Sequence, residues 1–212
     1  MRYNKRMTKY VYIDGQNFMY KAAEVLIESG RISSKDELTK LDIRGLIENI
    51  AGEGVGISYF GAKVRVRNDL GGEIAEKTTR FSDVSRRIRN TLQSQKISFN
   101  ESGKLKVRDS DKCHNCNHQD YRLQEKGVDV GIAVDMVEKA LTNTVNEHVL
   151  VSSDTDLIPA IKIIKASGSS VVYVGFSNKT TNAIIAKADR TEIIRDQEII
   201  DAYDRVNQPT LL

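Results

Sequence analysis

Several residue types that characterise other protein classes are scarce in this chain. Its 212 residues include two cysteines, two prolines and no tryptophan. Two neighbouring cysteines cannot build the disulfide framework of a small secreted domain. No apolar run approaches the roughly 20 residues that a membrane-spanning helix needs. The basic N-terminus MRYNKRMTKY leads into a strand-like segment without an apolar signal core, so we expect a cytoplasmic protein with no membrane partner.

The remaining composition is that of an ordinary globular protein. Hydrophobic residues make up 40% of the chain and charged residues 29%, which argues against extensive disorder. A chain of this length can bury most of its apolar surface around one core, and no linker or repeat divides it. We therefore expect a single domain over residues 1–212. The net charge of +3 is too small to identify a nucleic-acid partner by itself.

Short apolar runs alternate with amphipathic stretches along the whole chain. This pattern is typical of repeated β–α units that form a mainly parallel sheet, so we expect an α/β fold. The strand that ends at Asp14 and the strand HVLVSS carry nearly continuous apolar runs, so both are predicted at the centre of the sheet. The main predicted strands are KYVYI, ISYFGAKVRVR, HVLVSS and SVVYVGF.

The middle of the chain departs from this regular alternation. A hairpin is predicted from the strands KISFN and LKVRD, with a turn at ESGK. Together with the following cysteine-containing segment it forms a predicted insertion at about residues 96–124. Ser82 and Asp83 predict the start of a basic helix, and LQEKGVDVGIAVDMVEKAL is predicted as one long helix.

Aspartates follow two of the predicted central strands. Asp14 ends the first strand, Asp154 and Asp156 follow HVLVSS, and Asp129 lies near the start of the long helix. Ligands of open parallel sheets bind at the carboxyl ends of the strands. Carboxylates that meet there would repel one another, and a hard cation such as Mg²⁺ would relieve the repulsion. The alternative is that Asp14, Asp129 and Asp156 each cap a helix.

These segments also resemble the signature of the NYN domain, a branch of the PIN-like nuclease superfamily. The matching segments are YIDGQN (12–17), EKGVDVGIAVDM (125–136) and VLVSSDTDLIPAI (149–161). Their order and spacing are most similar to the LabA-like NYN proteins. The resemblance implies a three-layer α/β/α fold with a mainly parallel central sheet, and a Mg²⁺- or Mn²⁺-dependent nuclease that acts mainly on RNA.

The resemblance also implies roles for individual residues. Asn17 would orient Asp14 or contact phosphate, Ser152 would order the carboxylates, and Asp135 would be a supporting or structural residue. Water activated by the metal would attack the phosphodiester and leave 5′-phosphate and 3′-hydroxyl ends. The alternative is a catalytically inactive RNA-binding or regulatory module, because a retained fold does not guarantee chemistry. The implied metal-binding set is Asp14, Asp129, Asp154 and Asp156, and Asn17 joins these four in the implied catalytic set.

Basic residues are concentrated in the first half of the chain. Lys63, Arg65 and Arg67 alternate with valines, so a strand would place all three on one face. Arg87 adds charge on the following helix. These four residues are predicted to bind the backbone of single-stranded RNA, and the alternative is a solvated charged face.

Both cysteines lie in the segment DKCHNCNHQD. Cys113 and Cys116 have the C-x-x-C spacing of a zinc site, and His118 could add a third ligand. Three interpretations stay open: structural zinc completed by one outside ligand, zinc shared between two subunits, or a polar loop without metal. A homodimer could form through this segment or through an exposed strand edge.

Overall fold

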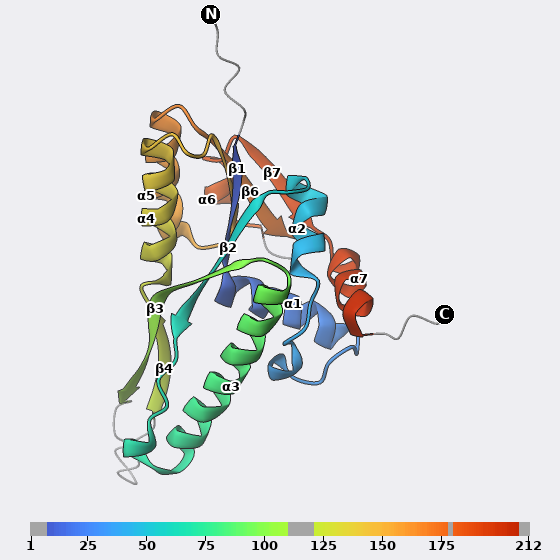
Figure 1. The fold of residues 1–212 in the computed structure, drawn as a ribbon, viewed down its shortest axis with the longest axis vertical. Coiled ribbons are helices and arrows are strands. Elements are labelled where there is room, and N and C mark those ends of the chain that lie inside the picture. The colour runs from blue at the N-terminus through green and yellow to red at the C-terminus, as the bar shows by residue number, and fades with distance from the viewer. Residues whose placement is uncertain (1–7, 110–120, 178–179, 208–212) are drawn as a thin grey trace, which may run out of the picture.

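The computed structural model describes residues 8–109, 121–177 and 180–207. Within these residues, seven strands form one sheet in the order β4–β3–β2–β1–β5–β6–β7 (Figure 1). Every neighbouring pair is parallel except β3 and β4, which are antiparallel. The strands are β1 (Lys9–Asp14), β2 (Gly56–Lys63), β3 (Ser98–Asp109), β4 (Tyr121–Lys126), β5 (Glu147–Val151), β6 (Ser170–Phe176) and β7 (Arg190–Ile194).

Helices cover both faces of this sheet. The α-helices are α1 (Gly15–Glu28), α2 (Ile43–Ala51), α3 (Gly72–Ser94), α4 (Val128–Leu141), α5 (Ile158–Ala166), α6 (Asn182–Ile185) and α7 (Asp196–Asn207). Three short 3₁₀ turns are η1 (Lys35–Glu37), η2 (Asn68–Leu70) and η3 (Thr155–Leu157). Figure 1 shows α4 and α5 on one side of the sheet and α1, α2 and α7 on the other. The predicted α/β class with a mainly parallel sheet is confirmed.

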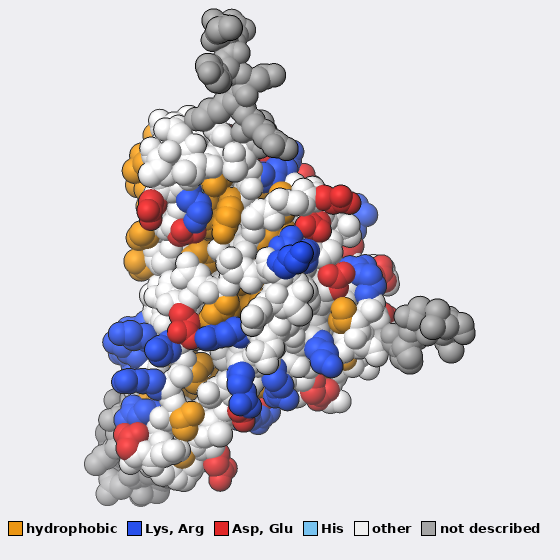
Figure 2. Space-filling model, viewed as in Figure 1, with side chains coloured by type: hydrophobic (Ala, Val, Ile, Leu, Met, Phe, Trp, Pro, Cys, Tyr) orange, Lys and Arg blue, Asp and Glu red, His pale blue; other side chains and the backbone are white. Residues whose placement is uncertain are grey.

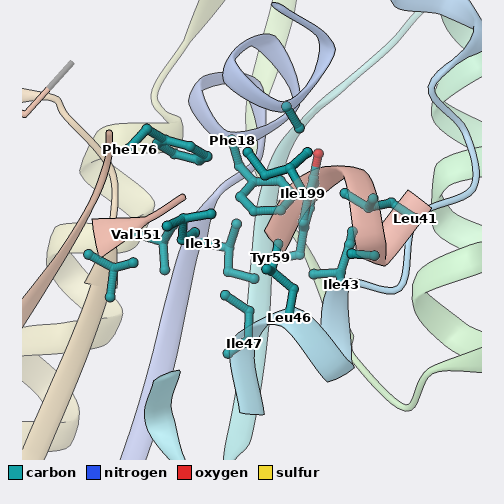
Figure 3. Packing of buried hydrophobic residues seen from close by; sticks show 14 of the residues in the cluster. Ile13, Phe18, Leu41, Ile43, Leu46, Ile47, Tyr59, Val151, Phe176 and Ile199 are labelled. Atoms are coloured by element: carbon teal, nitrogen blue, oxygen red, sulfur yellow. The ribbon is translucent and has the colours of Figure 1, made fainter. Parts of the chain in front are cut away.

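Two hydrophobic cores lie on the two faces of the sheet. Val11 and Ile13 of β1 point into the core under α1, α2 and α7, whereas Tyr12 points into the core under α4 and α5. This alternation follows from the two-residue period of a strand. Figure 3 shows the first core, in which Phe18 of α1 and Ile199 of α7 pack near Ile13. Both faces of the central strands are therefore buried, as their continuous apolar runs predict.

The predicted hairpin at ESGK is wrong. β3 continues through this segment and contains a bulge at Ser102, because Gly61 of β2 is paired with Glu101 and Ala62 with Gly103. A serine–glycine pair is compatible with either a turn or a bulge, and pairing with β2 selects the bulge. The strand that returns along β3 is β4, so the predicted long helix begins only at Val128.

Two further boundaries differ from the prediction. β2 ends at Lys63, so Arg65 and Arg67 lie beyond the strand rather than on its face. α3 begins at Gly72, so Ser82 and Asp83 lie inside a helix instead of capping it. Among the helices that the structure describes, none combines the length and apolar character needed to cross a bilayer. Cys113, Cys116 and His118 lie outside the described residues, and the zinc site stays a prediction.

Candidate active site

The carboxyl ends of β1 and β5 lie side by side at the centre of the sheet. From β1 the chain continues to β2 and β3 on one side, whereas from β5 it continues to β6 and β7 on the other. The loops that follow β1 and β5 therefore diverge and leave room between them, which is where open α/β sheets bind ligands. Asp14 is the last residue of β1, and Asp154 follows β5.

Hydrogen bonds hold Asp14 to elements on both sides of this space. One oxygen, Oδ1, accepts the backbone N–H of Asn17 at 3.1 Å and so caps α1. The other, Oδ2, accepts the hydroxyl of Ser152 at 2.9 Å. The Ser152 hydroxyl in turn accepts the backbone N–H of Asp154 at 3.1 Å, so the buried Ser152 links the two aspartates. The Asn17 side chain donates to Ser153 rather than to Asp14.

Four carboxylates from four segments line one pocket of about 370 Å³. Asp129 reaches it from the first turn of α4, and Asp14 and Asp154 reach it from the ends of β1 and β5. Glu125 reaches it from β4. The polar residues that complete the lining are Gln16, Gln124 and Lys126.

Glu125 was not predicted from the sequence. It lies in YRLQEK, whose alternating exposure marks Tyr121, Leu123 and Glu125 as one face of a strand. The two-residue period was the available signal, but the segment was assigned to the helix that follows. Once β4 is recognised as a strand, Glu125 and Leu105 of β3 share the face on which α4 packs.

Burial and the charges of neighbouring carboxylates disfavour the charged forms of Asp14 and Glu125. Burial is the main cause that raises the pKa of Asp14, and the charges of Asp154 and Asp129 raise it further against the hydrogen bonds from Asn17 and Ser152. Burial also raises the pKa of Glu125 to about 7, with additional contributions from Asp14 and Asp129. The pocket is therefore a place where a positive charge would be stabilised.

A family model for the NYN domain matches residues 9–195, which is most of the chain. The chain belongs to the NYN domain family. It is thereby placed in the PIN-like superfamily, as the three sequence motifs predicted.

Two known proteins are similar to this NYN domain. One is 6-hydroxy-3-succinoylpyridine 3-monooxygenase HspA of Pseudomonas putida (strain DSM 28022 / S16), with 26% identity over 201 residues. The match covers 84% of this chain and 63% of that protein, so the chain spans less than two thirds of the relative's length. The other is the crystal structure of VPA0982 from Vibrio parahaemolyticus RIMD 2210633, a protein of unknown function. Its TM-score is 0.56 at 17% identity, with 92% of this chain and 96% of that chain covered, which shows a shared fold.

The pocket of this NYN domain has the right chemistry for a hard divalent cation, because carboxylate oxygens are the ligands that Mg²⁺ and Mn²⁺ prefer. Within the part of the chain that the structure describes, no three His, Cys, Asp or Glu side chains stand close enough together to hold one ion. Mg²⁺ commonly takes one or two carboxylates and completes its shell with water and substrate phosphate. Asp14 and Asp154, joined through Ser152, fit that smaller requirement.

Two aspartates predicted for the site do not line this pocket, and neither do Asn17 and Ser152, which contact the residues around it. Asp156 is exposed and contributes only its backbone N–H, which donates to Asp154 Oδ1 at 2.9 Å. Asp135 lies on α4 and forms an ion pair with Lys139. A helix turns about 100° per residue, and the six-residue separation places Asp135 away from the direction of Asp129. The geometry therefore supports no role for either side chain in the pocket.

The predicted basic residues are divided between two places. Lys63, Arg65 and Arg67 line a separate groove next to β3. Arg87 lies on α3 and lines a shallow depression together with Arg80. The structure thus separates Arg87 from the other three, because α3 is a long helix that begins well before the predicted start.

Proposed function

We propose that this NYN domain hydrolyses the phosphodiester bonds of RNA with Mg²⁺ or Mn²⁺ bound in the acidic pocket. The observation that carries the proposal is the meeting of Asp14, Asp129 and Asp154 in one pocket at the centre of a parallel sheet. These residues come from distant parts of the chain, and burial together with the neighbouring charges raises the pKa of Asp14, so its charged form would be stabilised by a nearby cation. Membership of the NYN family supports a nucleic-acid substrate.

The residues of the chain have distinct parts in this reaction. Asp14 and Asp154 would hold the ion, and Asp129 and Glu125 line the same pocket and would bind it through water. When bound, the ion would polarise the scissile phosphate and lower the pKa of an attacking water. Ser152 keeps Asp14 and the backbone of Asp154 in a fixed relation, which limits the reorganisation required on binding.

The name of the Pseudomonas relative raises a second candidate, oxidation of a pyridine ring. The acidic pocket does not favour this candidate, because its lining is mostly charged or polar, with Val128 and Val130 as its apolar side chains and no aromatic side chain among the described residues. A flat heteroaromatic substrate would be expected to pack against apolar or aromatic side chains. An assay of 6-hydroxy-3-succinoylpyridine turnover, run beside the nuclease assay, separates the two candidates directly.

The test of the proposal is cleavage of end-labelled single-stranded RNA with Mg²⁺ or Mn²⁺. We expect Asp14→Asn and Asp154→Asn to lower the cleavage rate by about 100-fold or more, because each removes a charge that the ion needs. Asp201→Asn is a matched control, because Asp201 is an exposed residue of α7 that lies outside the pocket.

Each outcome selects one interpretation. Unchanged cleavage by both pocket variants would rule out this site. RNA binding by the native protein with no cleavage under any metal condition would favour the catalytically inactive RNA-binding module. Loss of cleavage in both pocket variants but not in Asp201→Asn is the result that supports the nuclease.

A further inference from the structure

A second concave surface lies next to the acidic pocket. It is a groove of about 840 Å³ between β3 and the segment that leaves β2. Its lining combines cationic side chains with three apolar ones, Val66, Leu105 and Val107. Figure 2 shows Lys and Arg side chains gathered in the part of the molecule where Figure 1 places β3, β4 and α3. The cations of the groove are Lys63, Arg65, Arg67, Lys104 and Lys106.

Three lysines form a row across the strands of this region. Lys63 of β2 is paired with Lys104 of β3, and Lys104 is paired with Lys126 of β4. Directly paired residues point to the same face of a sheet, and like charges in such positions are destabilising. All three lysines are exposed. Repulsion within this row of three lysines therefore lowers the stability of the folded protein.

Within residues 8–109, 121–177 and 180–207, carboxylates leave most of this positive charge without an ion pair. Among the residues that the structure describes, none of Lys63, Arg65, Lys104 and Lys106 forms an ion pair. Arg67 differs, because it forms a salt bridge with Asp69 at the end of the groove. These four cations, which have no ion-pair partner in the described part of the chain, are available to an anionic ligand.

The row of lysines joins the groove to the acidic pocket. Lys104 lines the groove, and its partner Lys126 lines the pocket. Neighbouring strands lie about 4.8 Å apart, so the row from Lys63 to Lys126 spans about 10 Å. An extended polyanion could therefore follow positive charge from the groove to the edge of the acidic pocket.

We propose that the groove binds the phosphates of single-stranded RNA next to the scissile bond and directs the strand into the acidic pocket. The lysines and Arg65 would contact phosphates, and Val66, an exposed apolar side chain of the lining, offers an apolar surface to the bases. The direction of the strand toward the pocket rests on the proposed nuclease function, whereas binding in the groove does not. A consequence is that RNA too short to reach the groove binds weakly.

The experiment measures binding without cleavage. Fluorescently labelled oligouridines of about 12 and about 3 nucleotides are titrated with the protein in EDTA over a series of salt concentrations. The variant is Lys63→Gln/Lys104→Gln, and the matched control is Lys162→Gln, an exposed lysine of α5 that lines neither surface. Both positions of the double variant are exposed, so a thermal melt close to that of the native protein is expected.

We expect the double variant to weaken binding of the longer RNA about tenfold and to reduce the salt slope by about 1.4, since each phosphate contact on a single strand contributes about 0.7. The short RNA should bind the native protein and the variant almost equally. Native-like affinity and slope in the double variant would overturn the proposal. Failure of the native protein to bind the longer RNA at low salt would also overturn it.

A further titration with polyglutamate of matched length tests whether the groove recognises RNA or any extended anion. Polyglutamate binding as tight as RNA binding would overturn the assignment to RNA. Because EDTA removes divalent ions, these results are independent of cleavage. If the native protein cleaves RNA and the double variant binds RNA normally, the proposed nuclease function stands and the proposed role of the groove is excluded.

Discussion

The Asp14 carboxylate has structural partners on two different elements. Oδ1 caps α1 through Asn17, and Oδ2 accepts from Ser152 at the end of β5. Helix capping and participation in an acidic site are therefore compatible at this residue, although the sequence presents them as alternatives. The cap stabilises the start of α1 and also fixes the direction of the carboxylate.

Ionisation of Glu125, which lines the pocket, lowers the free energy of unfolding. Folding raises its pKa from 4.5 to about 7, so the folded protein binds this proton more tightly than the unfolded chain does. The free energy of unfolding must therefore decrease as the pH rises from about 4.5 to about 7. Glutamine has a similar shape and no charge, so Glu125→Gln removes this dependence.

In EDTA we expect Glu125→Gln to be more stable than the native protein by about 1 kcal/mol at pH 8, after allowance for solvent screening of a partly exposed side chain. The two proteins should have similar stability near pH 5, where Glu125 is protonated. Urea denaturation at both pH values measures the difference. As a control, Glu138→Gln changes an exposed carboxylate of α4 and should alter stability by less than about 0.5 kcal/mol. A Glu125→Gln variant that is less stable than the native protein at pH 8 would contradict the destabilising effect of burial and of the Asp14 and Asp129 charges on ionised Glu125.

The sequence could identify Asp14, Asp129 and Asp154 because the central strands and the start of α4 carry clear signals. Glu125 lies on an edge strand of six residues, directly before a helix with a strong apolar pattern. A short amphipathic segment at such a border fits the end of a strand and the start of a helix equally well. Its pairing with β3 decides between them, and that pairing is a long-range interaction that local sequence does not encode.

At the scale of elements, the bulge in β3 sets the position of α4. An added β-carbon on Gly131 of α4 would lie 2.1 Å from the β-carbon of Ser102, and one on Gly103 would lie 2.3 Å from Val128 Cγ2. The backbones of β3 and α4 therefore approach as closely as glycine allows. This contact holds the first turn of α4, and with it Asp129, at the edge of the pocket.

Gly131→Ala tests this contact by the sign of its effect. In an ordinary helix interior, alanine is about 1 kcal/mol more favourable than glycine. Here we expect a loss of about 1–3 kcal/mol, because the new methyl group collides with Ser102. Chemical denaturation of the variant measures the change, and a stabilised Gly131→Ala would show that the two elements are free to separate.

The double variant Ser102→Gly/Gly131→Ala is the control. It removes the β-carbon that causes the collision. The buried Ser102 hydroxyl has no hydrogen-bond partner among the described residues, so its removal leaves no group unsatisfied. We expect the double variant to recover most of the lost stability, with a coupling energy above about 1 kcal/mol. Additive effects would exclude direct contact as the cause.

The elements of the sheet centre could be predicted, whereas those of the β2–β4 region could not. β1, β5 and β6 carry continuous apolar runs that only buried parallel strands explain. The start of α3 lacks a side-chain cap, and its N-cap position is Gly71, so no local signal marks it. Asp83 favours a helix cap and Gly103 favours a turn. Tertiary packing overrides both preferences, because Asp83 lies inside α3 and Gly103 lies inside β3.

At the scale of the whole molecule, the sheet consists of two halves that meet between β1 and β5. The chain extends from β1 to β2 and β3 on one side, and from β5 to β6 and β7 on the other. The order of strands depends on which apolar faces fit together, so the sequence predicted the central strands and their ends but not the neighbours of each strand. Asp14 and Asp154 could still be placed together, because parallel strands end on the same edge. The basic groove could not be predicted, because Lys63 and Lys104 meet only through the β2–β3 register.

A buried titratable group, His148, lies near the start of β5, whereas the pocket lies beyond the end of this strand. His148 is 0% exposed, stacks on Tyr12 with ring centroids 5.6 Å apart, and its Nδ1 lies 3.0 Å from the Tyr12 hydroxyl. Asp135 and Lys139 of α4 lie on the same side and complete the polar surroundings. Burial is the main cause that lowers the pKa of His148 from 6.5 to about 4.

This shift makes stability depend on pH in the sense opposite to Glu125. Between pH 6.5 and about 4 the unfolded chain binds the imidazole proton and the folded protein does not, so the free energy of unfolding falls as the pH is lowered. The loss is at most about 3 kcal/mol over this range. Because Glu125 titrates over an overlapping range, the dependence should be clearest in a Glu125→Gln background.

In that background we expect the free energy of unfolding to decrease from about pH 6.5 to about pH 4.5, and the addition of His148→Phe to remove most of this slope. Phenylalanine keeps a ring against Tyr12 but leaves the Tyr12 hydroxyl unpaired, so an offset of about 1 kcal/mol at every pH is expected as well. Urea denaturation at several pH values separates slope from offset. Parallel pH curves for the two proteins would show that other groups cause the acid sensitivity, and that the His148 ring either is protonated in the folded protein or titrates as it does in the unfolded chain.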